Sequence, residues 1–142
     1  RNFVLTMLRA AKKTNVVRVV DDQHGGPTYA PHLAGALLQI AHTLANGDDP
    51  KHTGVFHAPP QGVCTWRRLA EAIYEGAQFR RGPHAAVEPI STAEYPTPAR
   101  RPANGRLDGA KLQDTFGIAL PHWREGLDAC MDAIAADHWR VD

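Results

Sequence analysis

Residues 96–108 read Pro-Thr-Pro-Ala-Arg-Arg-Pro-Ala-Asn-Gly-Arg-Leu-Asp, and the rest of the chain is organised around them. Three prolines and an Asn-Gly pair exclude a helix and make a poor strand, so this stretch is expected to be a shaped loop. The prolines hold Arg100 and Arg101 on a stiffened backbone, where a guanidinium fork suits a contact with phosphate or carboxylate. The alternative interpretation is an ordinary Pro-rich connector with a solvated arginine pair.

The composition fits one domain with a hydrophobic core. The chain has 142 residues, of which 43% are hydrophobic and 22% charged, as is typical of soluble globular proteins. A formal net charge of +1 argues against a nucleic-acid binder, which needs a strongly basic face. Charge is uneven, because residues 80–111 contain six Lys or Arg against three Asp or Glu. An anionic small ligand near this segment is therefore expected.

The cysteines and the apolar runs point to a cytoplasmic protein. Cys64 and Cys130 have no CxxC spacing, so neither a disulfide scaffold nor a zinc site is predicted. No apolar run approaches the length of a membrane span, and nothing resembles a signal peptide. The sequence opens on Arg1 without an initiator Met, and we expect it to be a piece of a longer protein.

Hydrophobic periodicity predicts an α/β domain with about four helices and three or four short strands. Asn2 and Thr65 are predicted N-caps, and Trp66 and Trp123 fall at helical spacing and are predicted to be core residues. Helices are expected at 3–13, 33–44, 66–77, 110–116 and 121–134. Strands are expected at 16–20, 54–58, 86–90 and 106–108.

A polar, glycine-rich loop at 21–29 follows the first predicted strand, where open α/β sheets usually bind ligands. Asp21 and Asp22 could be read as an acid/base or metal pair. Adjacent carboxylates in a strand point to opposite faces, however, so we expect them to bond backbone amides as loop residues. Asn2 is predicted to cap a helix, and the N-terminus of that helix could also bind a phosphate group of a ligand.

Several motifs of catalysis and cofactor binding are missing from the sequence. It contains no GxGxxG, no P-loop and no GxSxG elbow. None of its three tyrosines is followed four residues later by Lys, so the Tyr-x-x-x-Lys pair of short-chain dehydrogenases is absent. The histidines lack the one-turn helical spacing of a metal site, and His24, His32 and His57 are expected to be structural or loop groups.

Four segments together resemble a known family. They are Asn2-Phe3 opening a helix, VVDDQHGGPTY at 19–29, GVFH at 54–57 with Thr65-Trp66, and EYPTPARRPAN at 94–104. In this order they closely resemble the C-terminal part of the dTDP-4-dehydrorhamnose reductases, which belong to the extended short-chain dehydrogenase/reductases. The resemblance covers nearly the whole chain. It implies a parent enzyme that uses NADPH to reduce the C4 ketone of dTDP-4-dehydro-6-deoxy-L-mannose, giving dTDP-L-rhamnose.

The resemblance also implies what this chain contributes. Residues 1–142 would be the C-terminal nucleotide-sugar-binding domain, a small substrate lobe, with the Rossmann half missing. NADPH and the catalytic Tyr/Lys pair would belong to that missing half, leaving no catalytic or cofactor-binding residue here. The residues at the family's substrate-lobe motifs, expected to hold the dTDP-sugar, are Asn2, Gln23, Thr28, Arg100, Arg101 and Asn104. Arg100 or Arg101 is expected at the diphosphate.

The resemblance also has implications for metal binding and for dimer formation. Some members of the family form a dimer bridged by magnesium through glutamates, but Lys51 and Arg124 fall at or near those places here. No metal site is therefore predicted, and a homodimer is left open. Two other functions on the same fold are also left open: a non-catalytic regulatory or binding subunit, and an epimerase or dehydratase for another nucleotide-sugar.

Overall fold

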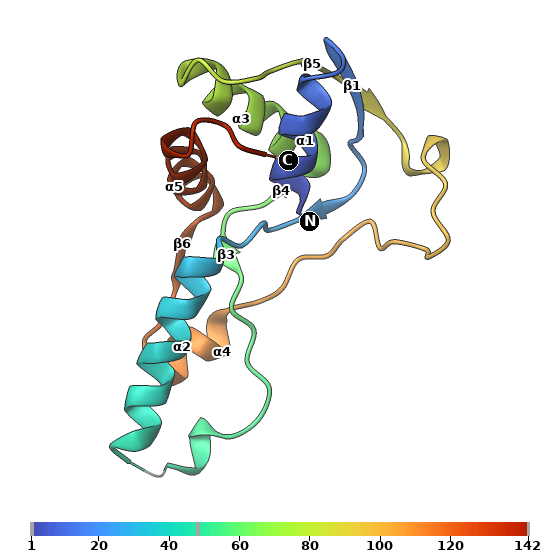
Figure 1. Cartoon of the computed structure of the whole chain (residues 1–142). Coiled ribbons are helices and arrows are strands. Elements are labelled where there is room, and N and C mark those ends of the chain that lie inside the picture. The colour runs from blue at the N-terminus through green and yellow to red at the C-terminus, as the bar shows by residue number, and fades with distance from the viewer. Residues whose placement is uncertain (1, 48, 142) are drawn as a thin grey trace.

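The computed structural model describes residues 2–47 and 49–141. Within them the chain forms a body and a projecting arm (Figure 1). The body contains α1 (Phe3–Ala11), β1 (Val16–Val20), β2 (His24–Gly25), β4 (Cys64–Thr65), α3 (Trp66–Phe79), β5 (Ala86–Ile90), η2 (Thr92–Glu94) and α5 (Trp123–Ala136). The arm contains α2 (Ala30–Ala45), η1 (Pro50–His52) and α4 (Ala110–Phe116), and β3 (Pro60–Gln61) and β6 (Leu120–His122) join it to the body.

α1 and α3 begin where a side chain accepts a hydrogen bond from a free backbone amide. Asn2 Oδ1 accepts a hydrogen bond from Leu5 N at 2.9 Å, and Thr65 Oγ1 accepts one from Arg68 N at 3.1 Å, which confirms both predicted N-caps. The last helix begins at Trp123 rather than at residue 121, because residues 120–122 form β6. The five predicted helices are thus all present among the described residues, with shifted ends.

Two of the four predicted strands are correct. β1 and β5 pair in parallel, with Val16 opposite Ala86 and Val20 opposite Ile90. The strand predicted at 54–58 is wrong: Val55 is 75% exposed, and its carbonyl accepts from Lys111 Nζ at 3.1 Å instead of from a neighbouring strand. The strand predicted at 106–108 is also wrong, because the pairing in this loop is an isolated bridge at Asn104.

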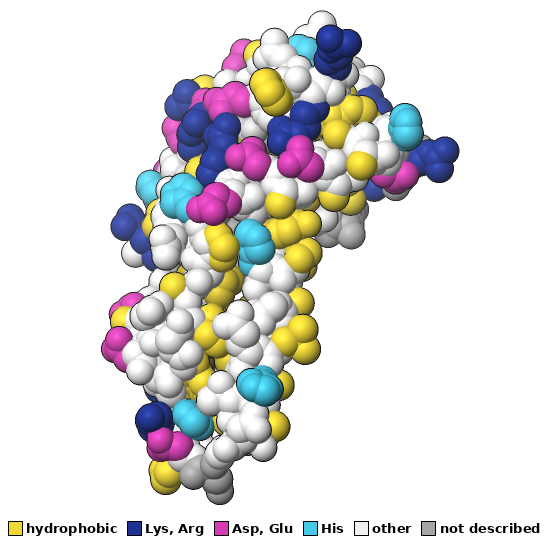
Figure 2. Space-filling view, turned by 90° about the vertical axis from the view of Figure 1, so that its left-hand side faces the viewer, with side chains coloured by type: hydrophobic (Ala, Val, Ile, Leu, Met, Phe, Trp, Pro, Cys, Tyr) yellow, Lys and Arg dark blue, Asp and Glu magenta, His cyan; other side chains and the backbone are white. Residues whose placement is uncertain are grey.

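An ion-pair chain runs along α3. Arg67 Nη1 lies 2.9 Å from Asp21 Oδ2, Arg68 Nη1 lies 2.8 Å from Glu75 Oε1, and Glu75 Oε2 lies 2.7 Å from Arg124 Nη2. Figure 2 shows basic and acidic side chains next to one another over the body. Such partly exposed pairs contribute below about 1 kcal/mol each, so their main effect is to fix the register of α3 against α5 and the loop after β1.

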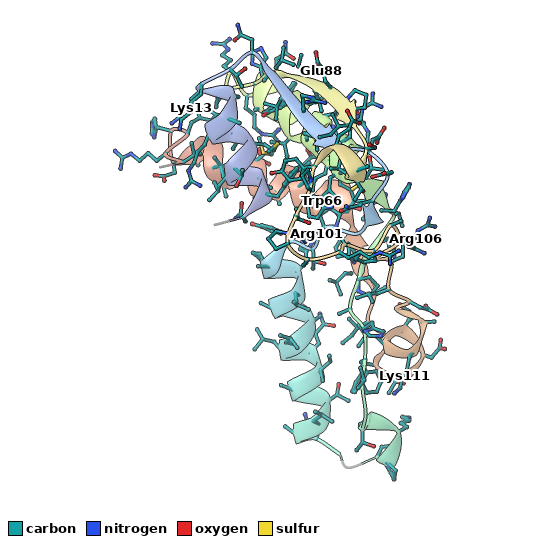
Figure 3. The ribbon with its side chains drawn as sticks, turned by 90° about the vertical axis from the view of Figure 1, so that its right-hand side faces the viewer. Lys13, Trp66, Glu88, Arg101, Arg106 and Lys111 are labelled. Carbon is teal, nitrogen blue, oxygen red and sulfur yellow. The ribbon has the colours of Figure 1, made fainter. Side chains whose placement is uncertain are left out.

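The arm carries apolar side chains that the body does not cover. Leu37, Leu38 and Leu44 of α2 are exposed, while Ala36 packs with Leu112 in a small second core. Figure 3 shows α2 leading away from the body beside η1 and α4. No helix within residues 2–47 and 49–141 is long and apolar enough to cross a membrane.

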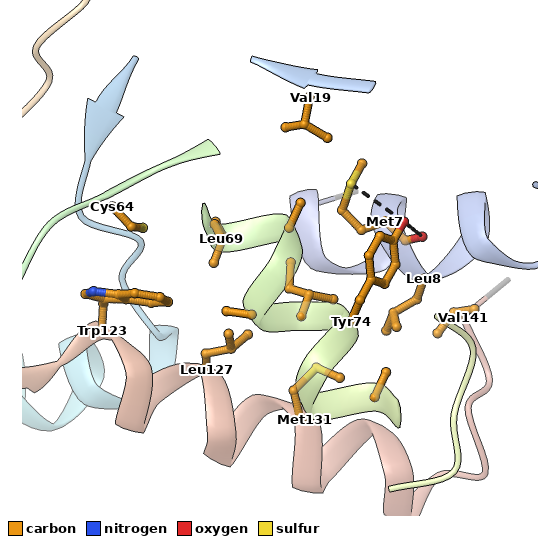
Figure 4. Close-up of a cluster of buried hydrophobic side chains, with 14 residues drawn as sticks. Met7, Leu8, Val19, Cys64, Leu69, Tyr74, Trp123, Leu127, Met131 and Val141 are labelled. Carbon is orange, nitrogen blue, oxygen red and sulfur yellow. Dashed lines mark hydrogen bonds between the residues drawn. The ribbon is translucent and has the colours of Figure 1, made fainter. Parts of the chain in front are cut away.

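The main core surrounds α3, which packs against α1, α5, β1 and β5 (Figure 4). Leu8, Ile73 and Met131 are fully buried there. Tyr74 Oη donates to the Met7 carbonyl at 2.9 Å, and burial raises the pKa of this tyrosine to about 12. Trp123 is 7% exposed, which confirms its predicted place in the core.

Candidate functional site

The Pro-Arg loop, residues 96–108, is anchored at both ends. On its N-terminal side, Glu94 closes the capping box of η2 and pairs with Arg18 Nη2 at 3.0 Å. On its C-terminal side, His24 N donates to the Ala103 carbonyl and Gly105 N donates to the His24 carbonyl, both at 2.8 Å. These anchors come from the strand β1 and the loop that follows it. Arg101, between these anchors, lines a cavity together with Val19 and Val20 at the end of β1.

Two cavities adjoin under this loop. The first, of about 250 Å³, lies between the loop after β1 and the start of α3, and we call it the glycine-side cavity. It is lined by residues 23–27, 64–66, 69, 101, 102 and 105. The second, of about 290 Å³, is called the aromatic cavity. It is lined by residues 3, 6, 7, 18–20, 23, 66, 95, 97 and 101.

Gln23, Trp66 and Arg101 line both cavities and so mark their junction. Figure 3 shows Trp66 and Arg101 close together where α2 leaves the body. Gln23 is 8% exposed, and its Nε2 donates to Thr92 Oγ1 at 3.0 Å. Within the described residues, the exposed Arg101 guanidinium has no hydrogen-bond or ion-pair partner. It is therefore available to an anion at this junction.

The two adjacent aspartates brace the site. Asp22 accepts hydrogen bonds from the Thr92 backbone N at 3.0 Å, as predicted for a loop carboxylate. Asp21 instead accepts from two side chains, Thr65 Oγ1 at 2.7 Å and Arg67 Nη1 at 2.9 Å. The hydrogen bond from Thr65, together with Arg67, holds the pKa of the Asp21 carboxyl below its ordinary value. Both carboxylates are thus engaged in holding neighbouring segments.

Replacing Thr65 with Val should loosen this brace. The variant loses the hydroxyl that caps α3 and bonds Asp21, so we expect it to lose about 1 kcal/mol of stability and to raise the Asp21 pKa towards its ordinary value. Because that pKa is depressed in the folded chain, Asp21 stabilises the fold above its unfolded pKa of about 3.9 and loses this effect as the pH falls further. An NMR titration of the Asp21 carboxyl carbon measures the shift. Thr65→Ser, which keeps the hydroxyl, should behave as the parent; an unchanged Asp21 pKa in Thr65→Val contradicts the brace.

The described residues lack the usual features of a metal site, of a reactive thiol and of a dinucleotide-binding site. No group of three or more His, Cys, Asp or Glu in them is placed to hold a metal ion. Burial raises the pKa of the Cys64 thiol to about 11, so this cavity-lining cysteine is protonated at neutral pH. The loop after β1 contains Gly25 and Gly26 but no GxGxxG motif, and the short strand β2 lies between β1 and α2, so this parallel strand does not offer the usual dinucleotide site.

Comparison with known proteins identifies the family. Residues 1–136 match the family model described as the RmlD substrate binding domain. The chain belongs to this family. The earlier resemblance and the α/β fold class are thereby confirmed.

Relatives of this RmlD substrate-binding domain include dTDP-4-dehydrorhamnose reductases. The one from Sinorhizobium fredii is 42% identical over 125 residues, covering 88% of this chain and 42% of the relative. The crystal structure from Clostridium acetobutylicum has a TM-score of 0.82 at 31% identity, covering 94% of this chain and 44% of that one. The structure from Bacillus anthracis, in complex with NADP, has a TM-score of 0.79 at 31% identity, covering 91% and 42%. The chain thus spans less than half the length of these relatives.

The six residues predicted from the RmlD-like motifs divide into two groups. Gln23 and Arg101 line both cavities. The other four line neither cavity: Asn2, Thr28, Arg100 and Asn104. As substrate-binding residues, all six stay predictions. Two of the four have local roles. Asn2 Oδ1 caps α1, and Asn104 Oδ1 accepts from Arg106 N at 3.1 Å.

The sequence prediction missed aromatic residues of the aromatic cavity. Trp66 was predicted to be core but is 38% exposed, because it is the first residue of α3 and lies at the open end of that helix. Phe3 and Tyr95 also line this cavity. A detectable signal was present for Trp66, since an N-cap directly precedes it and first-turn side chains often extend beyond the packed stripe of a helix.

Proposed function

We propose that this chain is the substrate-binding part of an NADPH-dependent reductase that converts dTDP-4-dehydro-6-deoxy-L-mannose to dTDP-L-rhamnose. The observation that carries the proposal is the pair of cavities meeting at Arg101, in a chain of the RmlD substrate-binding family. The reaction is proposed from the relatives, which are dTDP-4-dehydrorhamnose reductases. The two cysteines are free thiols, which agrees with a reductase of the cytoplasm.

The shape and charge of a dTDP-sugar suit this site. Such a ligand has a doubly charged diphosphate between two ends of low charge, a base and a sugar. Arg101 lies between two cavities of about 250 and 290 Å³, so the diphosphate can contact the guanidinium while each end enters one cavity. The anchored ends of the Pro-Arg loop reduce the entropy lost when the arginine is fixed.

We place NADPH and the catalytic groups outside this chain, which we propose is the C-terminal nucleotide-sugar-binding domain. The relatives are more than twice as long, and one of them is solved with NADP. The chain has no glycine-rich dinucleotide motif, and its buried Tyr74 is bonded to the Met7 carbonyl. In this arrangement the chain binds and orients the nucleotide-sugar, while the hydride and proton come from the other half.

Calorimetric titration of the 142-residue chain tests the placement of the two ligands. We expect saturable one-to-one binding of dTDP, because the anion site and both cavities belong to this chain. NADPH, the matched control ligand, should produce no binding heat. A chain that is folded by circular dichroism but does not bind dTDP contradicts the substrate role, and NADPH binding contradicts the placement of the cofactor.

The reaction itself is tested on the longer, full-length protein, which we propose contains both halves. A reductase consumes one NADPH for each dTDP-rhamnose formed, whereas an epimerase returns its nicotinamide unchanged. A regulatory subunit would bind dTDP without turnover. Product analysis with nicotinamide absorbance therefore separates the reductase from the two alternatives that share this fold.

A further inference from the structure

Gln23 is a buried polar side chain at the junction of the two cavities. Among residues 2–47 and 49–141 it is the one amide-bearing or charged side chain that is buried. Its Nε2 donates to Thr92 Oγ1 at 3.0 Å, but its Oε1 accepts no hydrogen bond from these residues. That oxygen is not sealed inside the protein either. It therefore opens into the cavities that Gln23 lines.

The neighbouring carboxylate decides where the Thr92 hydroxyl proton lies. Asp22 Oδ1 accepts hydrogen bonds from Thr92 N at 3.0 Å and from Thr92 Oγ1 at 2.5 Å. These two bonds, the one from the hydroxyl first, hold the pKa of the Asp22 carboxyl below its ordinary value. The ionised carboxylate can only accept at neutral pH, so the single proton of the Thr92 hydroxyl is committed to Asp22.

The committed hydroxyl in turn decides which end of the Gln23 amide faces it. Thr92 Oγ1 can only accept from its second polar neighbour, because its proton is already donated. The amide must therefore present Nε2 to Thr92, as the structure has it. Turning the amide by 180° would lose this hydrogen bond and bring two acceptors together. The carbonyl oxygen is consequently left for the cavities.

The backbone around Thr92 is anchored without help from its hydroxyl. Thr92 opens η2, where Ser91 and Glu94 form a capping box, and Glu94 pairs with Arg18 Nη2 at 3.0 Å. The Thr92 backbone N also donates to Asp22. The side-chain hydroxyl is thus free of any further duty in holding η2, and its two hydrogen bonds both belong to the chain that leads to Gln23.

We propose that Asp22 and Thr92 are positioning residues that hold the Gln23 carbonyl oxygen towards the cavity junction, where it accepts a hydrogen bond from the bound nucleotide-sugar. The inference rests on the proposed function, because it names two residues that act on this ligand through a third. Arg101 at the same junction carries only donors. The junction therefore presents one fixed acceptor beside a cation, which favours a ligand with both an anionic group and N–H or O–H donors.

Thr92→Val tests the chain of hydrogen bonds in the free 142-residue protein. Val keeps the branched shape and the backbone N but lacks the hydroxyl. We expect the Asp22 pKa to rise towards its ordinary value and the Gln23 side-chain amide signal to shift, both measured by NMR. Thr92→Ser, the matched control, keeps the hydroxyl and should match the unsubstituted chain. An unchanged Asp22 pKa or an unchanged Gln23 amide signal in Thr92→Val overturns the inference.

Binding of dTDP-L-rhamnose tests what the fixed acceptor does. Thr92→Val should weaken this binding about two- to twelvefold, the range for one neutral hydrogen bond. Pyrophosphate, which has neither sugar hydroxyls nor a base N–H, should change by less than about twofold. Thr92→Ser should bind both ligands within about twofold of the unsubstituted chain. Equal losses for the two ligands in Thr92→Val would indicate a general disturbance of the site and overturn the inference.

A double-mutant cycle separates positioning through Gln23 from packing. Gln23→Met keeps the length of the side chain but has no amide, so it removes the acceptor itself. If Thr92 acts through Gln23, adding Thr92→Val to Gln23→Met should weaken dTDP-L-rhamnose binding by less than about a further twofold. Circular dichroism verifies the fold of each variant. Losses that multiply fully in the double variant would show independent roles and overturn the inference.

Failure of the inference differs from failure of the proposed function. If the unsubstituted chain binds dTDP-L-rhamnose and Thr92→Val binds it equally well, the positioning role is wrong but the substrate role stands. If the folded, unsubstituted chain does not bind dTDP-L-rhamnose, the proposed function fails and the inference fails with it.

Discussion

Arg101→Ala is expected to weaken dTDP binding by about 1.5 to 3 kcal/mol, the usual range for a hydrogen bond to a charged group. This corresponds to a roughly 10- to 150-fold rise in the dissociation constant. The side chain lines both cavities and has no hydrogen-bond or ion-pair partner among the described residues, so its removal takes a charge from the candidate site without breaking a hydrogen bond or an ion pair of the fold. Calorimetry with dTDP measures the loss, and circular dichroism verifies the fold.

Arg106 supplies a matched control on the same loop. It is also exposed, and its guanidinium has no hydrogen-bond or ion-pair partner in residues 2–47 and 49–141, but it lines neither of the two cavities. Arg106→Ala removes the same net charge, so any general electrostatic effect appears in both variants. We expect dTDP affinity within about twofold of the parent for Arg106→Ala. Equal losses in the two variants would mean that net charge, not the position of Arg101, attracts the diphosphate.

Arg101→Lys tests the geometry of the contact. Lys keeps the charge but not the planar fork that contacts two phosphate oxygens at once. An intermediate affinity is expected. If Arg101→Ala binds dTDP as tightly as the unsubstituted chain, the diphosphate role of Arg101 is contradicted. Arg100, the other arginine predicted at the diphosphate, is then the next residue to test.

Much of the fold was predictable because it depends on local chemistry. Asn2 and Thr65 carry short oxygen-bearing side chains at the start of apolar helical patterns, and both cap helices as predicted. The β-branched run at 16–20 and the segment 86–90 form the parallel pair. The caps and the two separate strands need only neighbouring residues, which a sequence displays directly, whereas the parallel pairing joins distant segments and was not predicted.

The failed strand at 54–58 shows where local patterns mislead. Phe56 packs against the second core, and Lys111 Nζ lies 4.2 Å from the centroid of its ring. The segment therefore buries one aromatic side chain without pairing to another strand. Apolar alternation predicts burial of one face, but only the tertiary arrangement determines whether a strand lies beside it.

The candidate site was only partly predictable because it joins distant segments. Gln23 donates a hydrogen bond to Thr92, and the ring of Trp66 contacts the ring of Phe3. In both pairs the two residues are far apart in the sequence. The family-like motifs pointed to Gln23 and Arg101, which line both cavities, but gave no distances, and their role in binding stays a prediction. The aromatic residues of the aromatic cavity were missed because helical spacing assigned Trp66 to the core. Tyr95 lies in the loop motif, but no role in binding was predicted for it.

Ile73→Ala is expected to lower the free energy of unfolding by about 2 to 5 kcal/mol, the range for truncating a buried Ile to Ala. Ile73 is fully buried on α3, the helix that packs against α1, α5, β1 and β5. The variant loses transfer free energy and leaves a cavity that four neighbouring elements cannot all close. Ile73→Val, the matched control, should lose only about 0.5 to 1.5 kcal/mol. Urea unfolding followed by circular dichroism gives both values.

The same variant separates stability from binding. A ligand at 100 times its dissociation constant adds about 2.7 kcal/mol to the native state, so saturating dTDP should raise the urea midpoint of Ile73→Ala as much as that of the parent. Arg101→Ala should show the opposite pattern. Without dTDP its urea midpoint should equal that of the unsubstituted chain, and the same dTDP concentration should raise it only a little. Ile73 touches the core and not the cavities, so this crossed result is required if core and site are independent. A loss below about 1 kcal/mol in Ile73→Ala would contradict the tight packing around α3.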